Sequence, residues 1–348
     1  MTEQITLHRF DDMHCHFRTG EILKTVVPLT SLYAGRAVVM PNTRPRAILD
    51  ADDVTWYREQ ILAAIPPDHR DCFHPLMTIE IRNETTPAMV YAAYRAGAIA
   101  AKVYPRGVTT NAEHGMEQLL SAQAIDTFRA LDELGMLLLI HGERDEPRLL
   151  VTQREEAFLP TLQQLALQLP TLRIVLEHVS TRVGVETVRS LGANVAATIT
   201  AHHLCLTLND VIGNGVHPHH ACMPTPKGFD DLDALIEAAT SGDPKFFLGS
   251  DTAPHLREKK ECAHGACGVF TAPILPMLLA DMFERADRLD RLDDFVSRFG
   301  AEFYRIPRNH RKIVLGKRSW CVPAEYAGIV PFKAGELLSW QLIDSCVC

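Results

Sequence analysis

Residues that can bind a metal ion recur along the chain, each at or near the end of a short apolar run. They are His14, His16, Lys102, His141, His178 and Asp251. Lys102 and His141 are 39 residues apart, and His141 and His178 are 37 apart, each about the length of one β-α unit. Imidazoles and carboxylates are ligands for zinc and similar divalent metals. Four histidines and an aspartate exceed what one open catalytic zinc ion needs, so the set predicts two ions that could hold a hydroxide and polarise a carbonyl.

Lys102 is the unusual member of this set, because an ammonium group repels metal ions. Reaction of a neutral lysine amine with CO2 would give an anionic carbamate whose two oxygens could bridge two metals. Burial near cations lowers the pKa of a lysine and so favours the neutral amine. Each residue alone has an ordinary explanation, such as a strand end for Lys102 or a helix cap for Asp251. Their joint placement favours the metal site.

Eight short apolar or β-branched runs alternate with amphipathic segments, which indicates parallel β-α-β units. The predicted strands are 10–16, 36–40, 75–79, 99–103, 136–140, 173–177, 195–200 and 246–249. The predicted helices include 51–65, 87–96, 121–134, 155–169 and 181–190. Strand ends meet on one face of a (β/α)8 barrel, which would bring the candidate ligands together. A doubly wound open sheet has the same pattern, although no Gly-x-Gly-x-x-Gly follows the first strand.

The composition is that of a globular enzyme. The chain has 348 residues, 47% hydrophobic and 22% charged, which excludes disordered and fibrous classes. A net charge of −8 argues against nucleic acid as the main partner. No apolar run approaches a membrane span and no signal peptide is visible, so we expect a soluble cytoplasmic protein with its nine cysteines reduced. We predict one barrel domain over 1–348, with a helical and irregular C-terminal segment, about 281–348, packed on it.

Several ordered motifs carry a family resemblance. They are Asp-Asp-Met-His-Cys-His-Phe-Arg at 11–18, Val-Val-Met-Pro-Asn at 38–42, Ala-Ala-Lys-Val-Tyr-Pro at 100–105, Leu-Leu-Ile-His-Gly-Glu at 138–143, Leu-Glu-His-Val at 176–179, Ala-Thr-Ile-Thr at 197–200, Leu-Gly-Ser-Asp-Thr-Ala-Pro-His at 248–255 and Val-Pro-Phe-Lys-Ala-Gly-Glu at 330–336. The set resembles the amidohydrolase superfamily, most closely its short bacterial dihydroorotases. That resemblance covers nearly the whole chain. It implies reversible, zinc-dependent hydrolysis of (S)-dihydroorotate to N-carbamoyl-L-aspartate in pyrimidine biosynthesis, by a homodimer.

The resemblance also implies roles for individual residues. His14, His16 and Asp251 would bind one zinc ion, and His141 and His178 the other, with N6-carboxylated Lys102 as the bridge. Asp251 would carry the proton from the bridging hydroxide to the leaving nitrogen. The positions matched to substrate binding are Arg18, Asn42, His255, Met223, Ala253, Cys267, Thr109 and Thr110. Arg18, Asn42 and His255 match those that hold the substrate carboxylate, and Thr109 and Thr110 lie in a matching mobile loop.

Some positions depart from the family pattern or stand outside it. Met13 replaces a common Trp, Thr19 an Asp, Met223 a Leu and Cys267 a small residue, which concerns the shape of the pocket. The loop at 105–115 is bracketed by Gly107 and Gly115, as a lid would be. Five further histidines are interpreted as a substrate-side loop or as hydrogen-bonded structural residues: His202, His203, His217, His219 and His220.

Three other functions compete with this interpretation. A hydantoinase or dihydropyrimidinase would act on a cyclic amide without the carboxylate that Arg18 would bind, and such relatives typically add a β-sandwich built from both termini. With the first ligand at His14, the chain has little room for the N-terminal half of that sandwich. A non-catalytic barrel would be expected to lack a ligand. Serine catalysis fails because Gly249-Ser250 is not followed by the second glycine of a Gly-x-Ser-x-Gly turn.

Overall fold

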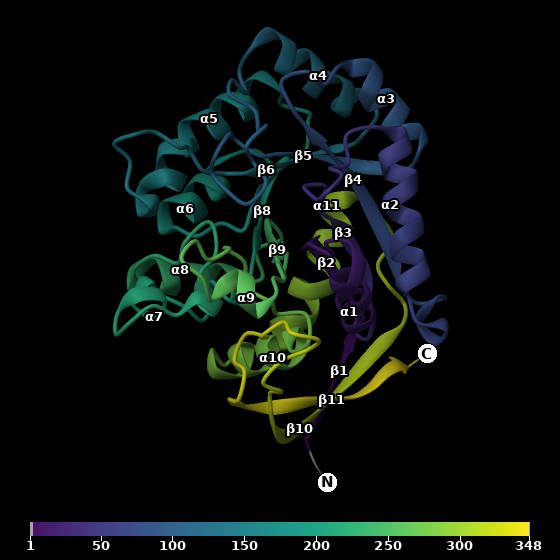
Figure 1. Cartoon of the computed structure of the whole chain (residues 1–348), viewed down its shortest axis with the longest axis vertical. Helices are drawn as coiled ribbons and strands as arrows, with labels where there is room; N and C mark the ends of the chain where they lie inside the picture. Colours follow the sequence, from purple (N-terminus) through teal and green to yellow (C-terminus); the bar gives the residue numbers. More distant parts are fainter. Residues whose placement is uncertain (1–2, 348) are drawn as a thin grey trace.

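A computed structural model describes residues 3–347, and its central feature is an eight-stranded parallel sheet in the order β2 to β9 (Figure 1). The strands are β2 (Phe10–Cys15), β3 (Ala34–Val39), β4 (His74–Ile81), β5 (Ala98–Val103), β6 (Leu137–His141), β7 (Ile174–Glu177), β8 (Val195–Ile199) and β9 (Phe246–Leu248). A parallel bridge joins Cys15, the last residue of β2, to Thr252, which follows β9 by four residues, and His16 N donates to Thr252 O at 3.0 Å. The ring is therefore closed, the (β/α)8 prediction is confirmed, and the open sheet is excluded.

Helices surround this barrel, α1 to α8 between successive strands and α9 to α11 after β9 (Figure 1). They are α1 (Gly20–Ser31), α2 (Ala51–Ala64), α3 (Pro87–Arg95), α4 (Ala122–Glu133), α5 (Arg154–Gln168), α6 (Arg182–Ser190), α7 (Leu208–Ile212), α8 (Phe229–Thr240), α9 (Arg257–Lys260), α10 (Leu275–Arg285) and α11 (Phe299–Tyr304). The five predicted helices agree with α2 to α6 to within one residue. Side-chain caps set several starts: Asp50, Ser121 and Thr181 each accept a hydrogen bond from the third backbone N–H beyond them.

Alternation along the strands decides which side chains enter the barrel. Apolar side chains fill its interior and pack together, including those of Ala100, Leu139, Val175, Ala196 and Phe247. In β5 to β8, the residues two positions further along point to the same side, because side chains alternate along a strand. These inward-pointing residues are Lys102, His141, Glu177 and Thr198. The barrel is thus apolar below and polar at the carboxyl ends of its strands, and all four polar side chains are buried.

The chain termini form a separate antiparallel sheet in the order β1 (Gln4–His8), β10 (Lys312–Cys321) and β11 (Leu337–Val347). The two long strands β10 and β11 were not expected in the C-terminal segment, about 281–348, which was predicted to be helical and irregular. The N-terminal residues contribute a single strand, β1, to this three-stranded sheet. These strands lack a clear alternating pattern, and β1 pairs with a partner some 300 residues away, Gln4 with Gly316, so local periodicity does not reveal them.

Replacing Trp340 with alanine should destabilise the protein, because this β11 side chain is fully buried and its Nε1 donates to Glu284 Oε2 of α10 at 3.2 Å. Truncating a buried Trp typically costs about 3–5 kcal/mol. Urea unfolding would measure the change, with Leu337→Ala in the same strand as control, since Leu337 is 72% exposed. If Trp340→Ala lowered the free energy of unfolding no more than Leu337→Ala does, the Trp340 side chain would contribute nothing to core packing.

Among residues 3–347, no helix is long and apolar enough to cross a lipid bilayer. The seven cysteines with described side chains are all free. Cys346 and Cys348, at the C-terminal end, have side chains outside the described part of the structure.

Candidate active site

Three of the predicted ligands meet at the seam that closes the barrel. His14 Nε2 lies 3.3 Å from His16 Nε2, and Asp251 Oδ1 lies 3.4 Å from the first and 3.1 Å from the second. Backbone pairing sets this arrangement, since Asp251 N donates to His14 O at 2.9 Å. The three side chains are buried and their donor atoms lie within 4.8 Å of one another, so they can converge on one ion.

His141, His178 and Lys102 lie beside this group. The rings of His141 and His178 have centroids 4.6 Å apart, and the rings of His178 and His14 are 5.2 Å apart. Lys102 is fully buried, with Nζ 5.2 Å from the centroid of the Tyr104 ring. Within the described chain, neither Lys102 Nζ nor His178 Nδ1 has a hydrogen-bond partner. Buried polar atoms are rarely left unpaired in native proteins, and those that are often face an ion, a water or a ligand.

Two glutamates outside the predicted set of site residues orient the histidines. Glu177 Oε2 lies 2.8 Å from His14 Nδ1 and accepts from Thr198 Oγ1 at 2.6 Å. Glu143 Oε2 lies 2.7 Å from His141 Nε2. A carboxylate on one ring nitrogen fixes the tautomer and leaves the other nitrogen free to bind metal. Glu177 has the inward parity of β7, which is the signal that would have identified it.

The protonation states suit metal binding. Burial is the main cause that lowers the pKa of His16 to about 3, and it also lowers the pKa of His141 and His178, so these rings are neutral at pH 7. Burial would raise the pKa of Asp251, but the hydrogen bond from His16 and the neighbouring histidines bring it below its ordinary value. Burial lowers the pKa of Lys102 to about 8. Neutral imidazoles, a carboxylate and an unpaired lysine together fit a divalent cation of the zinc type.

Strained backbone marks the same residues. Arg18, His178 and Asp251 have positive φ angles of 58°, 43° and 43°. Residues other than glycine rarely adopt this conformation, and where they do, they cluster at functional sites.

The predicted substrate-side residues line one pocket with the candidate ligands. This pocket includes His14, His16, Arg18, Asn42, Tyr104, Thr109, Thr110, His141, His178, Met223, Asp251, Ala253, Cys267 and Gly268. Tyr104 and Gly268 are additions to the predicted set. Two predicted residues are not among these lining residues: Lys102 is fully buried, and His255 lies beside two lining residues, with Nε2 3.1 Å from both Arg18 Nη2 and Cys267 O. Burial and the charge of Arg18 lower the pKa of His255 to about 3.

The predicted lid loop, 105–115, contacts this pocket. Asn42 Nδ2 donates to Thr110 O at 3.1 Å, and Asn111 Nδ2 donates to Asn42 O at 2.9 Å. Thr110 Oγ1 donates to Cys267 O at 3.4 Å on the opposite wall. The loop therefore lies across the pocket, held by these hydrogen bonds and by an ion pair of 2.6 Å between Arg44 and Glu113 at its outer side.

A buried lysine organises the wall opposite the lid. Lys260 is 4% exposed, and its ammonium donates to the backbone oxygens of Ala221, Ala266 and Gly268. These bonds join the segments that carry Met223 and Cys267, so Lys260 positions two lining residues without touching the pocket itself.

The departures from the family pattern fall in three places. Met223 and Cys267 line the pocket, and Met13 lies in the apolar interior of the barrel below it. Thr19 lies outside, where its hydroxyl donates to Arg44 O at 2.6 Å. Only the first two can alter the shape of the site.

Curated and solved proteins similar to this chain include dihydroorotases. Those of Shewanella denitrificans and Teredinibacter turnerae are 44% and 43% identical over 346 and 350 residues, covering 98% of this chain and 99% of each relative. The crystal structure of the Campylobacter jejuni dihydroorotase has a TM-score of 0.90 at 34% identity, covering 99% of this chain and 98% of that one. The Saccharomyces cerevisiae dihydroorotase, in complex with 5-fluoroorotic acid, has a TM-score of 0.89 at 33% identity, covering 97% and 98%.

An L-hydantoinase from Arthrobacter aurescens shares the fold, with a TM-score of 0.81 at 15% identity, over 98% of this chain and 83% of that one. No protein-family model matches the chain.

The barrel and the histidine, aspartate and lysine residues at its strand ends define a hydrolase of the amidohydrolase type. Relatives above 40% identity over almost the full length narrow this class. The chain belongs to the dihydroorotase family, as its motifs predicted.

Proposed function

We propose that this protein catalyses the reversible hydrolysis of (S)-dihydroorotate to N-carbamoyl-L-aspartate, a step of pyrimidine biosynthesis. The observation that carries the proposal is a half-buried arginine, Arg18, in the same pocket as the His14, His16 and Asp251 group. A guanidinium is suited to hold a carboxylate, while the metal-binding group is suited to open an amide. We further propose that the enzyme acts in the cytoplasm and, as the family resemblance implies, as a homodimer.

The substrate carboxylate would lie against Arg18, Asn42 and His255. Arg18 Nε donates to Pro254 O at 3.3 Å, which holds the side chain at the pocket wall. The related yeast protein holds 5-fluoroorotic acid, a pyrimidine that carries a carboxylate. A carboxylate there would accept charge-assisted hydrogen bonds, and the lid residues Thr109 and Thr110 would cover the ring.

Two zinc ions are the proposed cofactor, held by His14, His16 and Asp251 on one side and by His141 and His178 on the other, with carboxylated Lys102 between them. Such a centre polarises a carbonyl and lowers the pKa of water. Carboxylation forms a bond between Lys102 Nζ and the carbon of CO2 and releases one proton. The lowered lysine pKa and the absence of a hydrogen-bond partner for Nζ within residues 3–347 support this reaction.

Asp251 is the proposed proton carrier. Its carboxylate is ionised before reaction, because its pKa lies below its ordinary value. It would take a proton from the attacking water as the C–O bond forms, and return it to the ring nitrogen as the C–N bond breaks. The hydrogen bond from His16 and the strained backbone hold the carboxylate at the mouth of the barrel.

A hydantoinase or dihydropyrimidinase activity is the second candidate, supported by the shared fold alone. Turnover of dihydroorotate, hydantoin and dihydrouracil by one preparation, followed by ultraviolet absorbance in both directions, separates the two. Zinc content is measured on the same sample. Turnover of dihydroorotate with about two metals per chain supports the proposal. Bound metal without turnover of dihydroorotate would indicate that the substrate is another cyclic amide.

Replacing Arg18 with methionine should lower kcat/KM for dihydroorotate, mainly through a higher KM. Losing a hydrogen-bonded charge partner costs about 1.5–3 kcal/mol, or roughly 10- to 100-fold. Steady-state kinetics would measure this, with Arg129→Met as control, since Arg129 is on the exposed face of α4. Unchanged kinetics in Arg18→Met would remove this residue from the substrate site.

A further inference from the structure

His202, His203 and Cys222 form a second cluster of metal-binding side chains, outside the pocket described above. His202 and His203 follow β8, and Cys222 lies on the loop before α8. All three are buried, with exposures of 0%, 1% and 2%, and their donor atoms lie within 4.8 Å of one another. We propose that this cluster is a metal site of its own, one that binds Zn2+ through two imidazoles and a thiolate.

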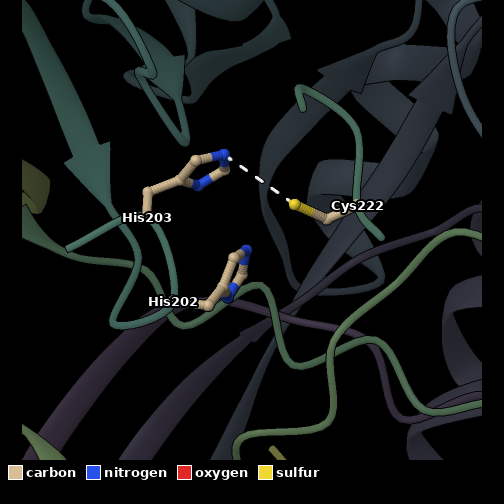
Figure 2. Close-up of side chains that lie close together, drawn as sticks. All are labelled: His202, His203 and Cys222. Atoms are coloured by element: carbon tan, nitrogen blue, oxygen red, sulfur yellow. Dashed lines mark hydrogen bonds between the residues drawn. The ribbon is translucent and has the colours of Figure 1, made fainter. Parts of the chain in front are cut away.

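Figure 2 shows the three side chains around a common space, with a nitrogen of the His202 ring directed between His203 and Cys222. His203 Nε2 and Cys222 Sγ are 3.9 Å apart. Tetrahedral zinc, with bonds of about 2.3 Å to sulfur and about 2.0 Å to nitrogen, places such atoms about 3.5 Å apart. The distance between His203 Nε2 and Cys222 Sγ must therefore shorten by a few tenths of an ångström on zinc binding. The other two donor-atom distances must shorten by at most about 1.5 Å, which rotation of the side chains can supply.

His202 points to a ligand independently of this geometry. Among the described residues, neither of its ring nitrogens has a hydrogen-bond partner, although the side chain is fully buried. A neutral imidazole presents one N–H donor and one lone pair, so both are unpaired here. This contradicts the interpretation of His202 as a hydrogen-bonded structural residue, which does describe His203. A cation on the lone pair would give this histidine a partner.

The other two side chains share one acceptor that a metal would replace. His203 Nε2 and Cys222 Sγ donate to Pro224 O at 2.9 and 3.2 Å, so Nε2 carries the ring proton here. Zinc binding would break both hydrogen bonds and move that ring proton to Nδ1, which lies 2.9 Å from Thr200 Oγ1 as its acceptor. Zinc binding would release the Cys222 thiol proton to solvent and form the Zn–S bond.

Charges on both sides act on the cluster. Burial raises the pKa of Cys222 well above its ordinary value, so the thiol stays protonated until a metal binds. Lys227 and Lys260 favour the Cys222 thiolate but disfavour positive charge at His203 and His202, whereas Asp251 favours positive charge at His202 and disfavours the thiolate. Because Met223 follows Cys222 and lines the substrate pocket, an ion here would tie that wall to the end of β8.

Cobalt substitution of the full-length protein tests the proposal, because a Co2+–thiolate bond gives a near-ultraviolet charge-transfer band that histidine and carboxylate ligands do not. After removal of metal by chelation, titration of the wild type with Co2+ should produce this band, with an intensity that corresponds to one thiolate-bound Co2+ per chain. Cys222→Ser should abolish it, and His202→Gln should weaken Co2+ binding there at least tenfold. Cys267→Ser is the control, because Cys267 is the thiol that lines the catalytic pocket.

The outcomes are decisive and independent of dihydroorotate turnover. The proposal is overturned if wild type shows no thiolate band, if Cys267→Ser removes it, or if His202→Gln binds Co2+ as tightly as wild type. Circular dichroism checks that each variant is folded. Should Cys222→Ser fail to fold, His202→Gln decides, since glutamine keeps a polar side chain of similar size.

Discussion

Asp251→Asn should lower kcat by at least about 10³-fold while leaving the barrel folded, because an amide cannot accept the proton that the proposed mechanism moves. Asparagine is the suitable replacement for two reasons. It keeps the size of the side chain, and it tolerates the positive φ of 43° at this position better than alanine does. The loss is therefore attributable to the carboxylate and not to the backbone.

Metal content must be measured on the same sample, since Asp251 is also a proposed ligand. Asp281→Asn is the matched control, because Asp281 is a buried aspartate in α10 that accepts from Ser339 N, outside the pocket. That variant should keep full metal content and nearly full kcat. An Asp251→Asn protein that retains its metal and more than a tenth of kcat would refute the proton-carrier role.

The second large effect is expected at Lys102. Lys102→Met should remove most of the bound metal and lower kcat by about 10³-fold or more, because the side chain can no longer form the carbamate that joins the two ligand groups. Lys102→Arg should be equally inactive, since a guanidinium stays charged and does not take up CO2. A lysine that acted only as a positive charge would instead be replaced well by arginine.

Metal analysis and kinetics after chelation measure this prediction. Wild type should regain zinc and activity only when bicarbonate is supplied with the metal, whereas both variants should regain neither. Lys245→Met is the control, because the Lys245 ammonium donates to backbone oxygens of Val188 and Leu191 near the start of β9, away from the strand ends. Full reconstitution of wild type without CO2 or bicarbonate would argue against carboxylation.

The alternating strands and helices of the barrel were predictable from local pattern, although the same pattern also fits an open sheet. Strands buried on both faces are continuous apolar runs, and helices between them have a period near 3.6 residues, so both are readable within a short window. The predicted site followed from the same regularity. His141 and His178 close successive β-α units, and their strands are parallel, so their side chains meet whatever the details of packing.

Other parts of the site depend on contacts between distant residues. Glu177 is adjacent to His178 in the sequence, yet its partner is His14, 163 residues away. His255 contacts Arg18, which lies 237 residues away in the sequence. Lys260 joins two pocket segments by hydrogen bonds to backbone oxygens, and every residue type has such an oxygen, so the sequence cannot reveal these bonds. The sheet of β1, β10 and β11 likewise rests on pairing between the two chain ends.

For this protein, residue order was enough to predict alternating strands and helices and the set of candidate ligands, because these depend on spacing that repeats along the chain, and its ordered motifs indicated the family. Closure of the ring between Cys15 and Thr252, and with it the 3.1 Å approach of His16 to Asp251, required the folded structure. So did the unpaired ring of His202 beside Cys222. Such features arise from the packing of elements far apart in sequence, where a shift of one residue in register would turn the same side chains away from each other.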